Sequence, residues 1–581
     1  MASERPETGR EISTAPWPRS LRLGLIAYAA ALAGALAVLL MVPYSGDFGT
    51  NVWLARHQDL WLLVAQFEIA ALCALPVFAT ARIRGLSARQ VAVLAAAVAA
   101  VCYAGHFAVL EAQDVLRDEQ MATFDAYVFA NGRLVWPIPP HWRAEAAALS
   151  LDFMAPVQHP VAWISLYLPG NAALRALVAQ VADPALTGPL LGAATVARVW
   201  SCARKIWPGQ PAVAAVCTAL TIGSGQVLFN AMSAFAMPLH LCLNLLWLRL
   251  WLADRRRADL AAIAVGALAT GAHQPLFHPL FAAPFLLLTL HDGQKGRFAL
   301  FGSAYLVIGL FWLNWPHAMT SLVTGPGSIT APRGVGYATR LLDTIAGNHD
   351  NLLMMLENLL RFCTWQNVLT VPLMLVGLAG LRGNRLAQAL ALGAALPVAV
   401  MAVILPWQGN GFGYRYLHPA LGNVILLAGF GWSALSRRVT GIEPILLRAT
   451  AGTLALALPL QMVLTHSVTR VFASASRAID AAPADYFLID PEAGIAAASL
   501  VINRPDLGNR PIRLNQARVA DPARLGATIC PGGRIAAFGS ARFYNRINRR
   551  YDSELLDEPA LYRTALTAAL VRAGCRIRVV D

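Results

Sequence analysis

The chain has 581 residues, of which 57% are hydrophobic and only 13% are charged. Soluble domains carry about 25% charged residues, so this composition excludes an ordinary soluble protein. The formal net charge of +14 does not indicate a nucleic-acid partner, because the basic residues gather between long apolar segments, where they indicate membrane topology.

The N-terminal segment 1–20 is polar and predicts a cytoplasmic tail. A cleaved signal is not expected, because the apolar segment that follows is too long and no small-residue cleavage site comes after it. Residues 21–466 predict a transmembrane helical bundle, since apolar segments of about 20 residues match the thickness of a bilayer core. We predict thirteen spans, at 21–42, 60–79, 90–110, 185–204, 211–229, 233–252, 258–272, 275–291, 298–316, 366–381, 386–405, 418–435 and 446–466.

The short basic loops predict the orientation. With the N-terminus in the cytoplasm, every one of them falls on the cytoplasmic side, as the positive-inside rule requires. Their basic residues are Arg82, Arg84, Arg89, Arg204, Lys205, Arg255, Arg256, Arg257, Lys295, Arg297, Arg382, Arg385, Arg437, Arg438 and Arg448. The external side, which is the periplasm if this is a bacterial inner-membrane protein, then receives the segments 111–184 and 317–365 and the tail 467–581.

The first external segment carries candidate acids. Asp118 and Glu119 precede aromatic residues at helical spacing, which predicts an amphipathic helix lying on the membrane surface. Two interpretations stay open: the acids stabilise the start of the helix through its dipole, or a carboxylate above the bilayer serves as a general base. Asp152 and His159 follow in the same segment, as further candidates or as simply solvated side chains.

Histidines and arginines on the external side are candidate substrate contacts. His273 and His278 join two spans, and their spacing around two prolines is not that of a helical metal-ligand pair. We therefore prefer pocket lining, with a divalent metal left open. Arg415 enters a span from outside between Tyr414 and His418, where it would either bind a lipid phosphate or anchor the interface. A weaker phosphate candidate in the 317–365 loop is Arg340.

The tail 467–581 regains an ordinary composition. Strands at 486–489, 534–538 and 575–580 and a helix at 558–573 predict a small α/β domain. Cys530 and Cys575 are its only cysteines. On an oxidising side of the membrane they would form a disulfide; the alternative is two unpaired thiols.

Several of these features together resemble the GT-C superfamily. They are the acidic pair on the first large external loop, the aromatic-rich helix ending in Ala-Asn-Gly-Arg-Leu, and the Tyr-Leu-Pro-Gly stretch from Tyr167. Residues 193–207 and 230–238 are similar to a helix and an external turn of that family. Its members are multi-span glycosyltransferases that use polyprenyl-phosphate sugars, including the protein mannosyltransferases and the aminoarabinose transferase of lipid A. The resemblance covers about residues 90–440; more than one span precedes the acidic loop here, whereas many members have one.

The resemblance implies transfer of a sugar, with inversion, from a polyprenyl-phosphate donor to an envelope glycan, lipid or protein at the external face. Asp118 would act as general base, Glu119 or Asp152 would orient the acceptor, and Arg415 would stabilise the departing phosphate. The chain has no Walker-type loop and no nucleotide fingerprint, which argues against a nucleotide-sugar donor.

Two other functions remain open. A transporter or flippase of a lipid-linked saccharide would predict charges inside the spans and an internal repeat, whereas the charges here gather at span ends. A non-catalytic assembly factor would bind an envelope partner through its external tail.

Overall fold

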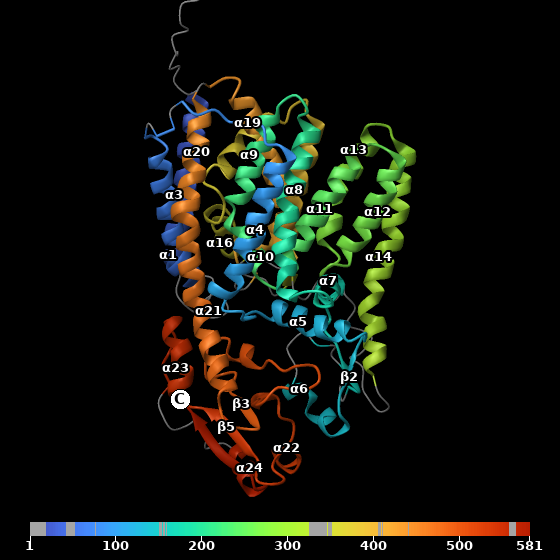
Figure 1. The fold of residues 1–581 in the computed structure, drawn as a ribbon, viewed down its shortest axis with the longest axis vertical. Coiled ribbons are helices and arrows are strands. Elements are labelled where there is room, and N and C mark those ends of the chain that lie inside the picture. The colour runs from blue at the N-terminus through green and yellow to red at the C-terminus, as the bar shows by residue number, and fades with distance from the viewer. Residues whose placement is uncertain are drawn as a thin grey trace, which may run out of the picture.

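The structure, a computed structural model, describes residues 19–41, 53–75, 77–78, 80–149, 154, 157, 160–324, 345–346, 351–404, 408, 411–439, 441–556 and 565–581. Figure 1 shows a large helical bundle and, below it, a smaller unit that contains a sheet and the C-terminus. Between the two lies helix α5 (Arg117–Ala130), the helix predicted from the acidic segment.

The bundle contains helices at the predicted apolar segments and also a helix, α16, inside the segment 317–365, which the sequence predicts as an external loop. They are α1 (Arg19–Met41), η2 (Ala55–Asp59), α3 (Leu60–Leu72), α4 (Ala88–Ala108), α8 (Thr187–Ile206), α9 (Pro211–Ile222), α10 (Gly225–Met232), α11 (Met237–Trp251), α12 (Arg256–Thr270), α13 (Phe277–His291), α14 (Lys295–Val323), α16 (Asn351–Thr364), α17 (Thr370–Ala379), α18 (Arg385–Ile404), η5 (Arg415–Ala420), α19 (Leu421–Leu435), α20 (Ile442–Gly452), η6 (Thr453–Ala457) and α21 (Leu458–Asp480).

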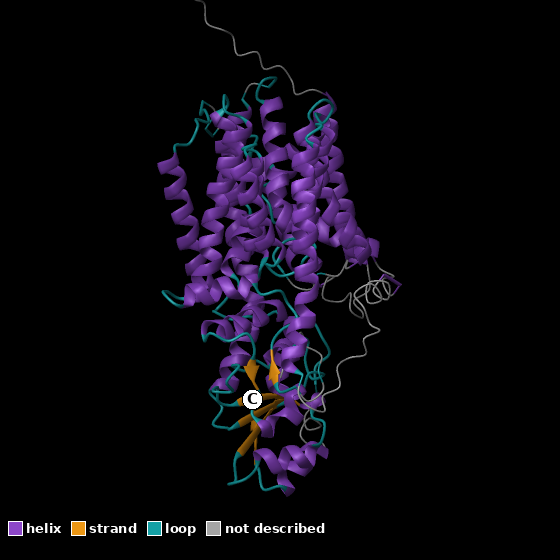
Figure 2. Ribbon diagram, turned by 90° about the vertical axis from the view of Figure 1, so that its right-hand side faces the viewer, coloured by secondary structure: helices purple, strands orange, loops and turns teal. Residues whose placement is uncertain are grey.

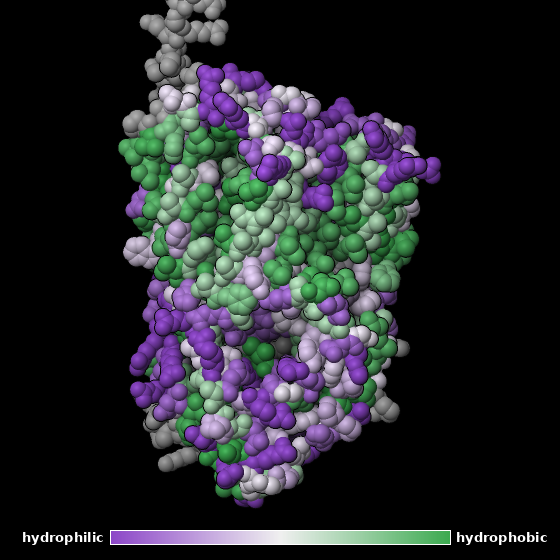
Figure 3. All heavy atoms as spheres, in the orientation of Figure 1, coloured by the Kyte–Doolittle hydropathy of each residue, from purple (hydrophilic) through white to green (hydrophobic). Residues whose placement is uncertain are grey.

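The surface of the bundle is that of a membrane protein. Among the described helices, four are long and apolar enough to cross a membrane: α4, α14, α18 and the continuous segment Ile442–Asp480. The pair α9 and α10, bent by 54°, makes a fifth if it is one span. On α14, Leu306, Val307 and Leu310 are each more than half exposed. Figure 3 shows an apolar band across the visible face of the bundle, with hydrophilic atoms above and below it. Contact of such an apolar surface with lipid is favourable, whereas its exposure to water costs free energy. The count of thirteen spans stays a prediction.

A parallel sheet forms the core of the lower unit (Figure 2). Its strands β3 (Tyr486–Ile489), β4 (Ile512–Asn515), β5 (Ile535–Gly539) and β6 (Arg576–Val580) are arranged in the order β4-β3-β5-β6. The sequence predicts three of these strands and misses the short β4. Helices α22 (Pro522–Ile529), α23 (Ala541–Arg550) and α24 (Ala565–Arg572) accompany the strands, with the short turns η7 (Ala497–Leu500) and η8 (Gln516–Arg518). A disulfide joins Cys530, after α22, to Cys575, before β6.

The segment 111–184, predicted to be external, folds against this sheet. It contains α5, β1 (Trp136–Pro137), η3 (Pro140–Glu145), α6 (Ala146–Leu149), β2 (Ala162–Trp163), α7 (Gly170–Ala179) and η4 (Pro184–Leu186). Met121, Phe124 and Val128 of α5 are buried in one core with Tyr486 and Leu488 of β3. The amphipathic pattern is therefore correct, but the expectation that this face rests on lipid is wrong, because the sheet covers it.

Candidate functional site

Asp118 and Arg415 form an ion pair where the bundle meets the lower unit. Arg415 Nη1 donates a hydrogen bond to Asp118 Oδ2 at 2.6 Å, and the Tyr167 hydroxyl donates to Asp118 Oδ1 at 2.5 Å. The Tyr167 ring in turn lies against the His273 ring, with centroids 4.1 Å apart. The aspartate side chain is 19% exposed, so it keeps an opening to solvent. Three residues singled out in the sequence thus meet, and Tyr167, noted only as part of a motif, connects them.

The electrostatics keep this pair charged. Burial raises the pKa of Asp118, but Arg415, His273 and the Tyr167 hydroxyl outweigh it and hold that pKa below its ordinary value. For Arg415, burial lowers the pKa of the guanidinium and Asp118 raises it, with a net increase. Burial also lowers the pKa of His273. At neutral pH the site therefore contains a carboxylate, a guanidinium and a neutral imidazole.

The pKa of Glu119, the next residue in the chain, is shifted in the opposite direction. It is buried, and this burial together with the neighbouring Asp114 raises the pKa of Glu119 well above its ordinary value. Its Oε2 accepts the backbone N–H of Leu116 at 3.1 Å. Adjacent carboxyl groups whose surroundings push their pKa values apart can take different roles in one reaction. At neutral pH Asp118 is ionised, whereas Glu119 holds its proton.

Glu119 also lines a cavity. The cavity has a volume of about 50 Å³, which is room for a few water molecules. Its walls come from η2, the segment after α4, the loop before η5 and the middle of α21, through residues that include Gln58, Gln113, Phe412 and Thr465. Apolar and polar groups therefore face a small space that borders Glu119, the neighbour of Asp118 in the chain.

The loop that carries Arg415 is fixed by side chains from distant helices. Three of its carbonyl oxygens accept hydrogen bonds: Gly411 from Arg361 at 2.7 Å, Phe412 from Asn230 at 3.1 Å and Tyr414 from Gln226 at 2.7 Å. Gln408 accepts the backbone N–H of Arg415 at 2.7 Å, and its carbonyl oxygen accepts from Arg415 Nη2. Such contacts hold the guanidinium in place before any ligand arrives.

Glycine is required within this loop. Gly413 has a φ of +69°, and a Cβ there would lie 2.5 Å from Gln226 Oε1. A side chain would therefore both strain the backbone and displace the glutamine that fixes Tyr414. The glycines of the Gly-Phe-Gly-Tyr-Arg sequence serve this close approach.

Arg361, which holds Gly411, belongs to a buried charge cluster. Its Nε lies 3.9 Å from Asp59 Oδ2 and its Nη1 lies 3.7 Å from Glu357 Oε1. All three side chains are completely buried or nearly so. No local pattern in the sequence predicts this cluster, because its members come from η2 and α16, which are far apart in the chain.

The other candidates are fully buried or lie outside the described residues. His278 is fully buried, with Nδ1 2.7 Å from Asn244 Oδ1 and Nε2 2.6 Å from the Tyr305 hydroxyl. His418 and Tyr414 are also fully buried. The predicted residues outside the described part of the chain are Asp152, His159 and Arg340. Within the described part, no group of three or more His, Cys, Asp or Glu residues is placed to hold a metal.

Fold and site together define a helical membrane protein with a carboxylate–arginine pair at one end of its bundle. Two similar solved structures are those of ArnT from Cupriavidus metallidurans. The apo form is 14% identical, with a TM-score of 0.44, over 71% of this chain and 84% of that one. The form bound to undecaprenyl phosphate is 16% identical, with a TM-score of 0.46, over 84% of this chain and 90% of that one. No family model and no curated protein matches the chain. At these identities and TM-scores neither structure decides the function, which we infer from the residues of this chain.

Proposed function

We propose that the protein is a glycosyltransferase that moves a sugar from a polyprenyl-phosphate donor to an envelope acceptor at the periplasmic face of a bacterial inner membrane. One observation carries the proposal: the ion pair of Asp118 and Arg415, which joins a potential base to a phosphate-binding cation. The pair lies at the end of the helical bundle that faces α5 (Figure 1), where the phosphate of a membrane-bound donor would be found. A polyprenyl chain would then occupy lipid while its sugar reaches the site.

The two charges suit a direct displacement. Asp118 accepts the proton of the acceptor hydroxyl as the acceptor oxygen forms a bond to the anomeric carbon. The bond between that carbon and the phosphate oxygen breaks, and polyprenyl phosphate leaves with the bonding electrons. Arg415 stabilises the charge on the leaving phosphate. Attack from the face opposite the leaving group inverts the anomeric centre.

Donor binding would prepare the base. Both oxygens of Asp118 accept hydrogen bonds in this structure, one from Arg415 and one from Tyr167. A donor phosphate competes for the guanidinium, because arginine binds phosphate in a bidentate manner. Once Arg415 turns to the phosphate, Asp118 loses its cation and its pKa rises, which strengthens it as a base. The order of events then makes donor binding precede proton removal.

Glu119 is assigned to the acceptor. A protonated carboxyl group can donate a hydrogen bond to a sugar oxygen, and Glu119, which directly follows Asp118 in the chain, keeps its proton at neutral pH. Asp152 keeps its predicted role as a second group for orienting the acceptor.

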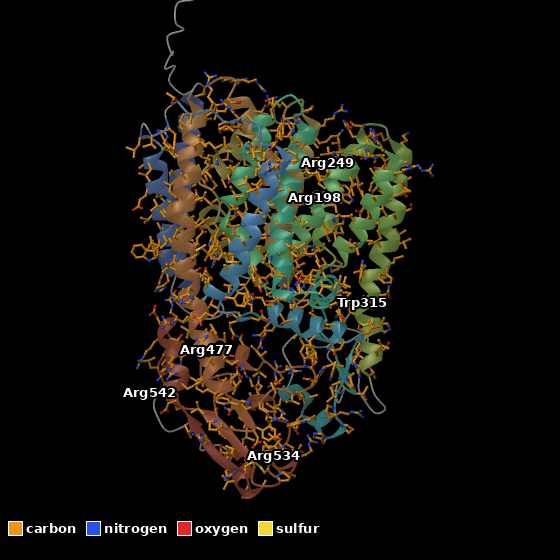
Figure 4. All side chains as sticks on the ribbon, in the orientation of Figure 1. Arg198, Arg249, Trp315, Arg477, Arg534 and Arg542 are labelled. Atoms are coloured by element: carbon orange, nitrogen blue, oxygen red, sulfur yellow. A yellow bond between two sulfur atoms is a disulfide. The ribbon has the colours of Figure 1, made fainter. Side chains whose placement is uncertain are left out.

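The test is transfer in proteoliposomes from a radiolabelled polyprenyl-phosphate sugar to an envelope extract. Asp118→Asn, which keeps the size of the side chain, should reduce kcat by about a hundredfold or more. The matched control is Glu111→Gln, which changes a carboxylate of the same segment. Glu111 Oε2 lies 2.6 Å from Nη1 of Arg477, an exposed residue on α21 (Figure 4). Full transfer by Asp118→Asn would overturn the assignment.

Transport of a lipid-linked saccharide is the second candidate. The buried cluster of Asp59, Glu357 and Arg361 favours it, because ionisable groups inside a helical bundle often mark transport pathways. The same cluster also fixes Gly411 in the loop of Arg415, so we place the transferase first. Measuring the label on both sides of the vesicle separates the two, since a flippase moves the donor without breaking its glycosidic bond.

A further inference from the structure

Two arginines lie on neighbouring helices, one inside the apolar band and the other at its edge, in the last turn of its helix. Arg198 is on α8 and Arg249 on α11, in the upper half of the bundle (Figure 4), at the end opposite to the candidate site. Arg198 comes eight residues before the last residue of α8, about 12 Å along the helix axis. Both side chains are half-buried. Figure 3 shows hydrophilic atoms interrupting the apolar surface in this region.

Ser201 connects the two arginines. Arg249 Nε donates to Ser201 Oγ at 3.1 Å across the contact between α8 and α11. Arg198 lies three residues before Ser201 on α8, which places both side chains on the same face, one turn apart. The three residues therefore form one polar patch between the two helices.

This patch has no acid to balance it. Among the described residues, no ion pair or hydrogen bond reaches the guanidinium of Arg198, and Ser201 is the only side-chain partner of Arg249. The two carboxylates nearest to Arg249 along the chain, Asp254 and Asp259, both pair with Arg297, at 2.9 and 2.7 Å. Two positive charges thus remain at the edge of the apolar band and just inside it, beside a serine hydroxyl that can also donate.

We propose that Arg198, Ser201 and Arg249 bind the phosphate of an anionic phospholipid from the leaflet at this end of the bundle. A guanidinium in hydrocarbon costs several kcal/mol unless an anion or water reaches it. Snorkelling carries a single arginine upwards, but the hydrogen bond to Ser201 holds Arg249 against α8. The oxygens of one phosphate can accept hydrogen bonds from both planar guanidinium groups and from the Ser201 hydroxyl. The acyl chains of the lipid would lie against the exposed apolar surface below.

Native mass spectrometry of the purified full chain in detergent tests this proposal. The probes are phosphatidylglycerol, diacylglycerol with the same chains, and inorganic phosphate. Phosphatidylglycerol should bind at least ten times more tightly than diacylglycerol, and millimolar inorganic phosphate should not displace it. Equal binding of the two lipids would overturn the proposal, as would displacement by inorganic phosphate, which would indicate a site for free phosphate.

Variants locate the site. Arg198→Gln with Arg249→Gln should lower the affinity for phosphatidylglycerol about tenfold, as expected for the loss of charge-assisted hydrogen bonds. The control is Arg256→Gln with Arg257→Gln, which removes the same charge from exposed positions at the start of α12. Equal effects of the two pairs would overturn the assignment. If the first pair does not fold, Arg198→Lys with Arg249→Lys keeps the charge but loses the fork, and should bind more weakly than the unmodified chain; unchanged binding would count against the site.

Discussion

Arg415 and Asp118 are 297 positions apart in the sequence and 2.6 Å apart in the structure. The first begins η5 at the edge of the bundle, and the second lies in the first turn of α5, outside it. Their contact ties the acidic segment 111–184 to the helical bundle. It also places the Arg415 guanidinium where a lipid phosphate would compete for it, which leads to the following prediction.

Arg415→Lys tests whether the site needs a planar fork. Lysine keeps the charge but cannot bind phosphate in a bidentate manner or reach both Asp118 and the Gln408 carbonyl oxygen. We expect kcat/KM for the donor to fall roughly tenfold to a hundredfold, and Arg415→Gln to lose more, because it also removes the charge. Steady-state assays at several donor concentrations measure this. A lysine variant with unchanged kcat/KM would show that charge alone suffices.

Asn230→Ala tests the fixed loop. The variant removes the hydrogen bond to the Phe412 carbonyl oxygen and leaves that buried oxygen without this donor. We expect a loss of about 1–3 kcal/mol in stability and roughly a tenfold loss in transfer rate, because Arg415 is then less well positioned. Asn314→Ala on α14 is the control, since Asn314 is exposed and bonds only within its own helix, to Leu310 at 2.7 Å. Equal rates for the two variants would contradict a role for the loop contacts.

The buried carboxyl group of Asp125 should make the stability of the fold depend on pH. Burial raises the pKa of Asp125 from 3.8 to about 7, although Ser165 lowers it through its hydroxyl and backbone N–H. The native state therefore binds this proton more tightly than the unfolded chain does. The contribution of Asp125 to stability is complete below about pH 4 and is lost as the pH rises through about 7, a change of about 4 kcal/mol.

Asp125→Asn should flatten this profile in thermal unfolding followed from pH 4 to 8, because asparagine does not ionise. Asp506→Asn is a control of opposite sign: burial raises the pKa of Asp506, but Tyr127, Gly508 and Arg504 lower it further. That carboxylate stabilises the fold above its ordinary pKa, and its contribution is lost as the pH falls. Parallel profiles for the two variants would contradict these assignments.

The disulfide determines how many cysteines can be labelled before and after reduction. Of eight cysteines, all but Cys530 and Cys575 are free. Maleimide labelling in denaturant should modify six cysteines before reduction and eight after it. Because the bond closes a loop over a sequence separation of 45 residues, replacing both cysteines by serine should cost about 3–4 kcal/mol in the stability of the lower unit. Eight labels without reduction would show that the bond is absent in the isolated protein.

The sequence by itself determined the helices and most of the sheet. Long apolar segments predict most of the bundle from α1 to α21, because only a helix satisfies its own backbone in lipid; the exception is α16, in a segment predicted as an external loop. The turn signals and apolar runs of the tail predict β3, β5 and β6, while β4, with the short sequence Ile-Arg-Leu-Asn, has too little pattern to be recognised. The sequence also singled out Asp118, His273 and Arg415, since charges and histidines at membrane interfaces are few.

Only the tertiary structure decided what these elements contact. The pattern of α5 predicts an apolar face, but periodicity does not say what covers that face, and here the cover is β3 and not lipid. The pairing of Asp118 with Arg415, and of Asp59 and Glu357 with Arg361, depends on which helix ends meet. Such contacts join residues hundreds of positions apart and leave no local pattern, because packing and charge compensation act through space.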